Sequence, residues 1–275
     1  MLGVLLSYAF VFLAALPIRY LRLNFGRKIF LLSTTACASG LLAMGLWQWA
    51  IVYLSISSLI GFYRELEESR VSIFASAFAA IGLTTLLSGA ALMTYTTLSG
   101  TGVKRLLLEK ATPLLEQMQK VPRFQEASLQ NFLWYLPSGL IITLMLILFV
   151  SLTLGRLPRQ TKQNQSLLYF KLPDWAIWFF IGGLGATFIP TQGSVLALSA
   201  MNVLVITLAA YFFQGLAVFT FFLDRFNIQG LWRLLAYFLV FFQMFVFISG
   251  LGILDYWFDF RSQPTSAKPI RKKII

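Results

Sequence analysis

The chain has 275 residues, of which 58% are hydrophobic, 16% are aromatic and only 12% are charged. A soluble protein carries about 25% charged residues, so a chain with half that share and long apolar runs has lipid as its solvent. With no histidine, imidazole catalysis and histidine metal sites are excluded, and one cysteine, Cys37, allows neither an internal disulfide nor a thiolate cluster. We therefore predict a polytopic membrane protein that holds no metal and no other cofactor.

Eight candidate spans follow from the apolar runs, since about 20 apolar residues cross about 30 Å of hydrocarbon. The first is 5–20. The uncharged run 29–63 is too long for one helix, and Trp47, Gln48 and Trp49 indicate an interfacial turn that divides it into two spans, with one tilted span as the alternative. The other five are 71–97, 133–154, 173–190, 195–223 and 231–254. Because backbone groups in hydrocarbon must bond internally, we predict an all-α transmembrane helix bundle.

The connections are basic. Residues 98–132, between the fourth and fifth spans, mix charged residues with leucines, which is typical of an amphipathic helix lying in the interface. A loop helix packed on the ends of the bundle fits equally well. Residues 1–261 are expected to form a single integral membrane domain, and the basic tail 262–275 is expected to have no fixed fold. The net charge of +12 lies mainly at span ends, which indicates anionic lipid headgroups and not nucleic acid as the acidic partner.

Polar residues inside the spans are the candidates for a ligand site. The acids Asp174, Asp224 and Asp255 fall at span ends, where water or headgroups reach them, and this argues against a proton-coupled pump. The uncharged candidates for ligand binding or for interhelical hydrogen bonds are Asn202, Gln214, Gln243 and Gln48. Asn202 and Gln214 point about 120° apart on one helix, so both cannot face one ligand from the same stripe.

Small residues recur four positions apart, which lets helices approach closely in lipid. The pairs are Ala36 and Gly40, Ala75 and Ala79, Ser76 and Ala80, and Gly182 and Ala186. They serve either packing inside the bundle or docking against a second membrane protein, and the sequence leaves both open. The basic residues of the short loops favour an N-terminus outside the cell, but the basic C-terminal tail contradicts this, so the orientation of the termini also stays open.

The end of the last span has the most specific pattern, with Gly250-Leu251-Gly252 followed by acids that alternate with aromatic residues up to Arg261. The aromatic residues suit the headgroup level, while Asp255 or Asp259 is expected to pair with Arg261, or with Arg19 or Arg233 of another span. A structural role, in which this segment anchors the end of the last span at the headgroups, explains the pattern fully. The candidates for a partner contact are Asp255, Trp257, Asp259, Arg261 and Arg225.

With this pattern at the end of the last span, the sequence resembles the YybS-like family of predicted bacterial membrane proteins, a domain of unknown function. The likeness rests on Leu16-Pro17 with the basic stretch up to Gly26, on Asn202 with Tyr211, 214–217 and Arg225, and on 250–261. The family is similar in fold to the substrate-binding membrane subunits of energy-coupling-factor transporters and to MreD-type cell-shape proteins. The resemblance implies a multi-pass protein of the bacterial cytoplasmic (inner) membrane that docks on another membrane protein, without defining a substrate.

We expect a non-enzymatic membrane protein that resembles a transporter substrate-binding subunit, binds a small molecule or lipid within its bundle and acts with a membrane partner. No Gly-rich phosphate loop with its lysine is present, and no carboxylates cluster as in an acid–base enzyme. The alternative is a membrane scaffold or an assembly subunit of an envelope complex. A binding subunit predicts a closed polar cavity near Asn202 and Gln214, whereas a scaffold predicts a filled core.

Overall fold

The computed structural model describes residues 2–69, 71–100, 129–154, 170–188 and 195–261, with the single positions 102, 105, 112 and 116. These residues contain eight helices and no strand, which confirms the all-α prediction. The chain divides into two compact units, residues 1–159 and 160–275. The single membrane domain expected over 1–261 stays a prediction.

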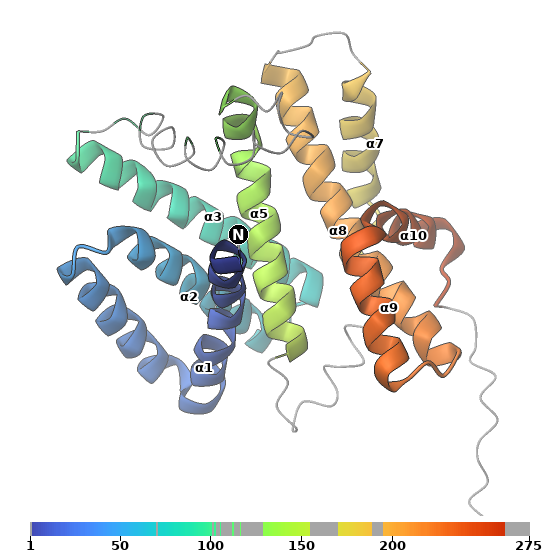
Figure 1. Ribbon diagram of the computed structural model, residues 1–275, viewed down its shortest axis with the longest axis horizontal. Coiled ribbons are helices and arrows are strands. Elements are labelled where there is room, and N and C mark those ends of the chain that lie inside the picture. The colour runs from blue at the N-terminus through green and yellow to red at the C-terminus, as the bar shows by residue number, and fades with distance from the viewer. Residues whose placement is uncertain are drawn as a thin grey trace, which may run out of the picture. The chain divides into compact units, whose positions relative to one another are not determined.

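The first unit begins with α1 (Leu2–Ala43), a long helix that bends at Gly26. Gly26 has φ 77° and ψ −178°, a conformation that glycine adopts at little steric cost because it has no Cβ. Figure 1 shows the two parts of α1, in dark and lighter blue, running in different directions. The sequence predicted a connection over 21–28 between two separate spans. In the structure this stretch is helical on both sides of Gly26, and the kink lies at that residue.

The run 29–63 is divided, as predicted, by a turn between α1 and α2 (Trp47–Glu68), but neither helix is among those long and apolar enough to count as a span. The turn lies at Met44 to Leu46, directly before the expected Trp47, and Gly45 takes a φ of 73°. From there α2 packs against the second part of α1, where the ring of Phe30 lies against Gly61.

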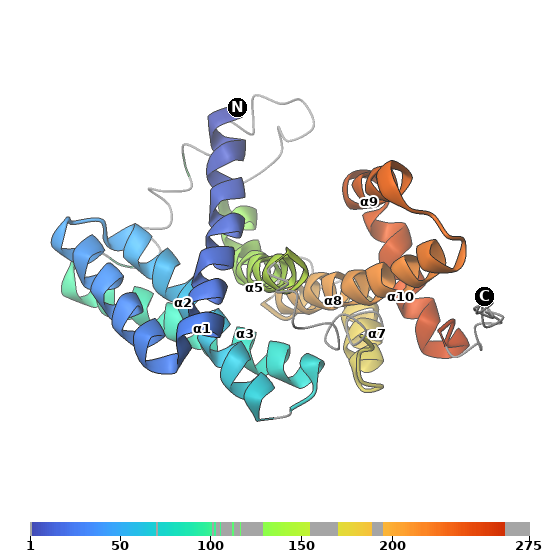
Figure 2. The same cartoon turned by 90° about the horizontal axis from the view of Figure 1, so that it is seen from below.

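The third helix, α3 (Ile73–Leu98), starts at Ser72, whose hydroxyl accepts a hydrogen bond from the Ala75 N–H at 3.3 Å. Such a cap satisfies one of the free amide groups of the first helical turn. The helix packs mainly on α2, and the predicted small-residue pair Ser76 and Ala80 is fully buried inside the unit. α5 (Leu129–Leu154) completes the unit and lies beside the first part of α1, as Figure 2 shows.

The second unit is built on α8 (Val195–Arg225), which both α7 (Ala176–Thr187) and α10 (Phe245–Phe258) contact. α9 (Gly230–Gln243) lies between α8 and α10 in the chain. Two left-handed residues, Asn227 (φ 55°) and Gly230 (φ 61°), turn the chain from α8 into α9. The axis then bends by 96° between α9 and α10.

Three of the described helices are long and apolar enough to cross a membrane, and a fourth span results if α9 and α10 count as one bent pair. The three are α3, α5 and α8, which match the predicted spans 71–97, 133–154 and 195–223. The predicted count of eight spans is not confirmed.

The structure corrects two of the predicted spans. The sixth, at 173–190, contains α7 with 12 residues, a length of about 18 Å that is too short to cross about 30 Å of hydrocarbon alone. The eighth, at 231–254, is bent by 96° and is not one straight helix. Two other predictions, the interfacial segment over most of 98–132 and the tail 262–275, lie outside the described residues.

Candidate functional site

The C-terminal end of α10 folds back on itself and surrounds a buried carboxylate. Asp259 ends the helix in the left-handed conformation (φ 42°, ψ 56°), and its N–H donates to the Asp255 carbonyl at 3.0 Å. A left-handed residue at this position is common, and Asp tolerates it better than most residues. The next two residues therefore return over Asp255. Its Oδ1 accepts from the Phe260 N–H at 3.2 Å, and its Oδ2 accepts from Arg261 Nη2 at 2.5 Å.

Gln214 on α8 joins this carboxylate to a third segment of the chain. Its Nε2 donates to Asp255 Oδ2 at 3.0 Å, and its Oε1 accepts from the Leu172 N–H at 2.9 Å. Arg261 Nη1 donates to the Phe170 carbonyl at 2.8 Å. Gln214 is 1% exposed and Asp255 is 0% exposed, so the network is sealed from solvent. It ties α8 to the chain before α7 and to the end of α10.

Two glycines explain how Gln214 reaches Asp255. A Cβ on Gly215 would lie 1.8 Å from the Ile248 carbonyl oxygen, and a Cβ on Gly252 would lie 2.1 Å from the Tyr211 carbonyl oxygen. The backbones of α8 and α10 are therefore in direct contact, as small residues permit between helices in lipid. This close crossing brings the amide of Gln214 within hydrogen-bond distance of α10.

The network joins three of the sequence candidates, Gln214, Asp255 and Arg261, and confirms one of the expected pairings, Asp255 with Arg261. One expectation is wrong: Asp255 was placed where water or headgroups reach it. It is fully buried, because the left-handed cap at Asp259 folds the following residues over its carboxylate.

The other candidates lie outside the network. Asn202 donates to the Leu198 carbonyl of its own helix at 2.9 Å, and Asp259 lies 3.4 Å from Lys171 at the surface. The side chains of three candidates, Gln48, Arg225 and Trp257, are exposed. Gln243 is in α9, and its side chain lies outside the described residues.

A second buried polar group, in the first unit, was missed in the sequence. Arg19 and Arg22 lie at the end of the first predicted span, where positive charge was expected to meet lipid headgroups, yet they are only 6% and 5% exposed. Arg22 Nη2 lies 2.7 Å from Glu65 Oε1 and 3.5 Å from Glu68 Oε2. The only sequence signal is spacing: residues three apart share one helix face.

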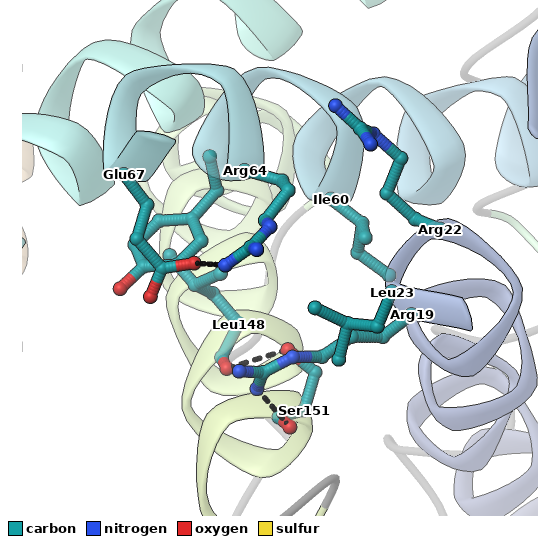
Figure 3. A pocket seen from close by; sticks show the side chains of 9 residues that line it. Arg19, Arg22, Leu23, Ile60, Arg64, Glu67, Leu148 and Ser151 are labelled. Atoms are coloured by element: carbon teal, nitrogen blue, oxygen red, sulfur yellow. Dashed lines mark hydrogen bonds and ion pairs between the residues drawn. The ribbon is translucent and has the colours of Figure 1, made fainter. Parts of the chain in front are cut away.

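The same group continues along α2 and reaches α5. Arg64 Nη1 lies 2.6 Å from Glu67 Oε2, and Arg64 Nε lies 3.0 Å from Glu68 Oε1. Arg19 Nη1 donates to the Ser151 carbonyl of α5. Figure 3 shows Arg64 against Glu67 and Arg19 against Ser151. These side chains line a small cavity of about 10 Å³.

A chain whose described residues contain helices only, three or four of them able to cross a bilayer, is a membrane protein. The family model described as "Predicted membrane protein (DUF2232)" matches residues 1–256, and the chain belongs to this family. The matched range includes Gln214 and Asp255 and ends before Arg261. No curated protein and no solved structure matches the chain. The YybS-like resemblance agrees with this family, whereas the likeness to energy-coupling-factor and MreD-type proteins is not confirmed.

Replacing Gln214 by leucine is expected to lower the free energy of unfolding by about 1–3 kcal/mol, because it leaves a buried N–H and a buried carboxylate each without one partner. The matched control is Gln48→Leu, at an exposed position, where the change is expected to stay within about 0.5 kcal/mol. Unfolding in mixed detergent micelles measures both variants. Equal values for the two would contradict a structural role for Gln214.

Proposed function

We propose that this membrane protein is a non-enzymatic scaffold or assembly subunit of the bacterial cytoplasmic membrane that docks another membrane protein. The observation that carries this proposal is the filled core around Gln214. Both ends of its amide are bound by protein groups, and the helices beside it are in backbone contact at Gly215 and Gly252. A ligand site needs polar groups that converge on a cavity, whereas here they converge on one another.

A transporter-like subunit that encloses a small molecule near Asn202 and Gln214 has less support. Gln214 is engaged in the buried network, and Asn202 bonds to its own helix one turn earlier. Asp255, the buried acid of the second unit, is paired with Arg261 and hydrogen-bonded to Gln214. In this proposal its role is to hold α10 against α8.

The outer side of α7 supplies a surface on which a partner helix could dock. Its inner side packs on α8 at Gly183, where a Cβ would lie 3.2 Å from Leu204. Trp178, Gly182 and Gly185 are exposed and follow one another at spacings of four and three, which places them on one side of the helix. Cβ atoms at both outer glycines would meet nothing within 4 Å, so this side is open to close approach.

Replacing Gly182 by leucine is expected to reduce recovery of a co-purifying membrane partner at least tenfold, because the larger side chain holds a second helix away from α7. The measurement is crosslinking in the native membrane, followed by purification and mass spectrometry of bound proteins and small molecules. The variant should fold normally, since the side chain enters open space.

Gly89→Leu is the matched control, because Gly89 is also an exposed glycine of an apolar helix with open space around its Cβ. It should retain the partner. Loss of the partner from both variants would contradict docking at α7. Recovery of a stoichiometric small molecule without any protein partner would favour the transporter-like subunit instead.

A further inference from the structure

The long helix α1 changes direction at a single residue. Within Leu2–Ala43 only Gly26 has non-helical dihedral angles (φ 77°, ψ −178°), and the residues on both sides of it are helical. These angles are accessible almost exclusively to glycine. Glycine also adopts helical angles, so rotation at Gly26 alone is enough to join the first part of α1 (2–25) and the second part (27–43) into one straight helix. Other contacts must therefore hold α1 in its kinked shape.

A group of ion pairs at the end of α2 connects the two parts of α1. Glu65 Oε1 lies 2.7 Å from Nη2 of Arg22, which precedes Gly26, and Glu65 Oε2 lies 3.6 Å from Nη1 of Arg27, which follows it. Glu68 Oε2 lies 3.5 Å from the same Nη2 of Arg22. In a straight helix, residues five apart point about 140° away from each other, whereas the kink brings both arginines to one carboxylate. We call these four charged residues the Glu65 clamp.

The position of the acids in α2 indicates that they serve α1. Both acids of the clamp lie in the last turn of α2, where the helix dipole disfavours negative charge, and this turn has no basic residue. Arg64 of α2 binds Glu67 and Glu68, which leaves Glu65 to the two arginines of α1. The side chain of Arg22 is only 5% exposed, so breaking its ion pairs would leave a buried charge without a counter-charge.

We propose that α1 is a hinged helix and that the Glu65 clamp holds it in the kinked shape. In this shape the first part of α1 lies beside α5, where Arg19 donates to the Ser151 carbonyl (Figure 2). The second part is packed on α2 through the ring of Phe30 against Gly61. When the clamp opens, the first part swings away from α5 as α1 straightens, while the second part stays on α2.

The test measures the distance between spin labels on the two parts of α1 by pulsed electron paramagnetic resonance, with the full-length protein in lipid nanodiscs. One label is attached to Cys37, the single cysteine of the sequence, which is exposed in the second part. The other is attached to Leu13→Cys in the first part, where the side chain is 47% exposed. A straight helix places these positions about 36 Å apart, at about 1.5 Å per residue, and the kink brings them closer. With the clamp intact, we expect a single distance well below that value.

Two substitutions open the hinge by different routes. Glu65→Gln removes the charge that bridges the kink. Gly26→Ala removes the residue type that the kink requires, and because nothing lies within 4 Å of the added Cβ, it acts through the backbone alone. Each substitution is expected to add a second population at about 36 Å, the separation in a straight helix.

Each substitution has a matched control. Asp224→Asn removes a carboxylate that is 44% exposed, against 40% for Glu65, and that pairs with Arg233 in the second unit. Gly40→Ala lies in the helical second part of α1, also with nothing within 4 Å of its Cβ. Both controls should keep the single short distance.

Three results would overturn the proposal. A short distance that Glu65→Gln leaves unchanged would mean that packing alone holds the kink, and this variant decides the question if Gly26→Ala does not fold. A separation near 36 Å with the clamp intact would mean that α1 is straight. A second population in the controls as large as in the two hinge variants would mean that the clamp and Gly26 have no special role.

Discussion

Replacing Asp255 by asparagine is expected to lower the free energy of unfolding by about 3 kcal/mol, because breaking a buried ion pair from one side leaves the other charge uncompensated. Asp255 is 0% exposed, and the side chain of its partner Arg261 is only 5% exposed. Asparagine keeps the shape and can accept a hydrogen bond, so the loss measures mainly the missing charge. A fall in stability of this size should also release the segment near Phe170, which Arg261 holds through its carbonyl.

Asp259→Asn provides the matched control. Asp259 lies four residues further on, pairs with Lys171 at 3.4 Å, and is about half exposed, so its pair contributes at most about 1 kcal/mol. Asparagine also tolerates the left-handed conformation of this position. Unfolding in mixed micelles, with cleavage near residue 170 by limited proteolysis as a second readout, compares the two variants. An equal loss of stability in both would contradict the buried pair.

The sequence was most informative where hydropathy alone decides the structure. The spans at 71–97, 133–154 and 195–223 correspond to α3, α5 and α8, because a bilayer demands about 20 apolar residues in a row. Hydropathy carries no information on the direction in which the chain runs or on where a helix bends. The chain changes direction at the kink at Gly26, within a basic stretch, and at the bend of 96° between α9 and α10, within an apolar run. For this reason the number and the limits of the predicted spans differ from those of the observed helices.

In the candidate site, only the contact between residues that are close in the chain could be predicted from the sequence. Asp255 and Arg261 are six residues apart across a helix end, and their pairing was among those expected. That Gln214 joins them depends on where α8 and α10 cross. The sequence shows three glycines in these helices, Gly215, Gly250 and Gly252. It does not show that Gly215 and Gly252 lie where the helices cross, while Gly250 faces open space.

The buried arginines of the first unit were not predictable for a related reason. A basic residue after an apolar run usually extends to the headgroups, and Arg19 and Arg22 follow such a run. Their burial depends on α2 and α5, whose contacting residues lie more than 40 positions away in the chain. Only a folded structure shows that these arginines share a cavity with Arg64.

Replacing Gly252 by alanine is expected to lower the free energy of unfolding by about 3 kcal/mol, the upper end of the usual cost of overpacking. The added Cβ would lie 2.1 Å from the Tyr211 carbonyl oxygen and 2.8 Å from the Gly215 N, and neither backbone atom can rotate away. α10 must therefore move away from α8, which lengthens the 3.0 Å hydrogen bond between Gln214 and Asp255.

The control is Gly250→Ala, two residues earlier on the same helix, where a Cβ meets nothing within 4 Å. There alanine should stabilise the helix by about 0.5–1 kcal/mol, because glycine loses more backbone freedom on folding. The two substitutions thus differ in sign, and equal effects would contradict the crossing. Because Gly252→Ala already disrupts the hydrogen bond to Asp255, adding Asp255→Asn to it should cost less than Asp255→Asn costs alone, a coupling that residues in one network show and distant residues do not.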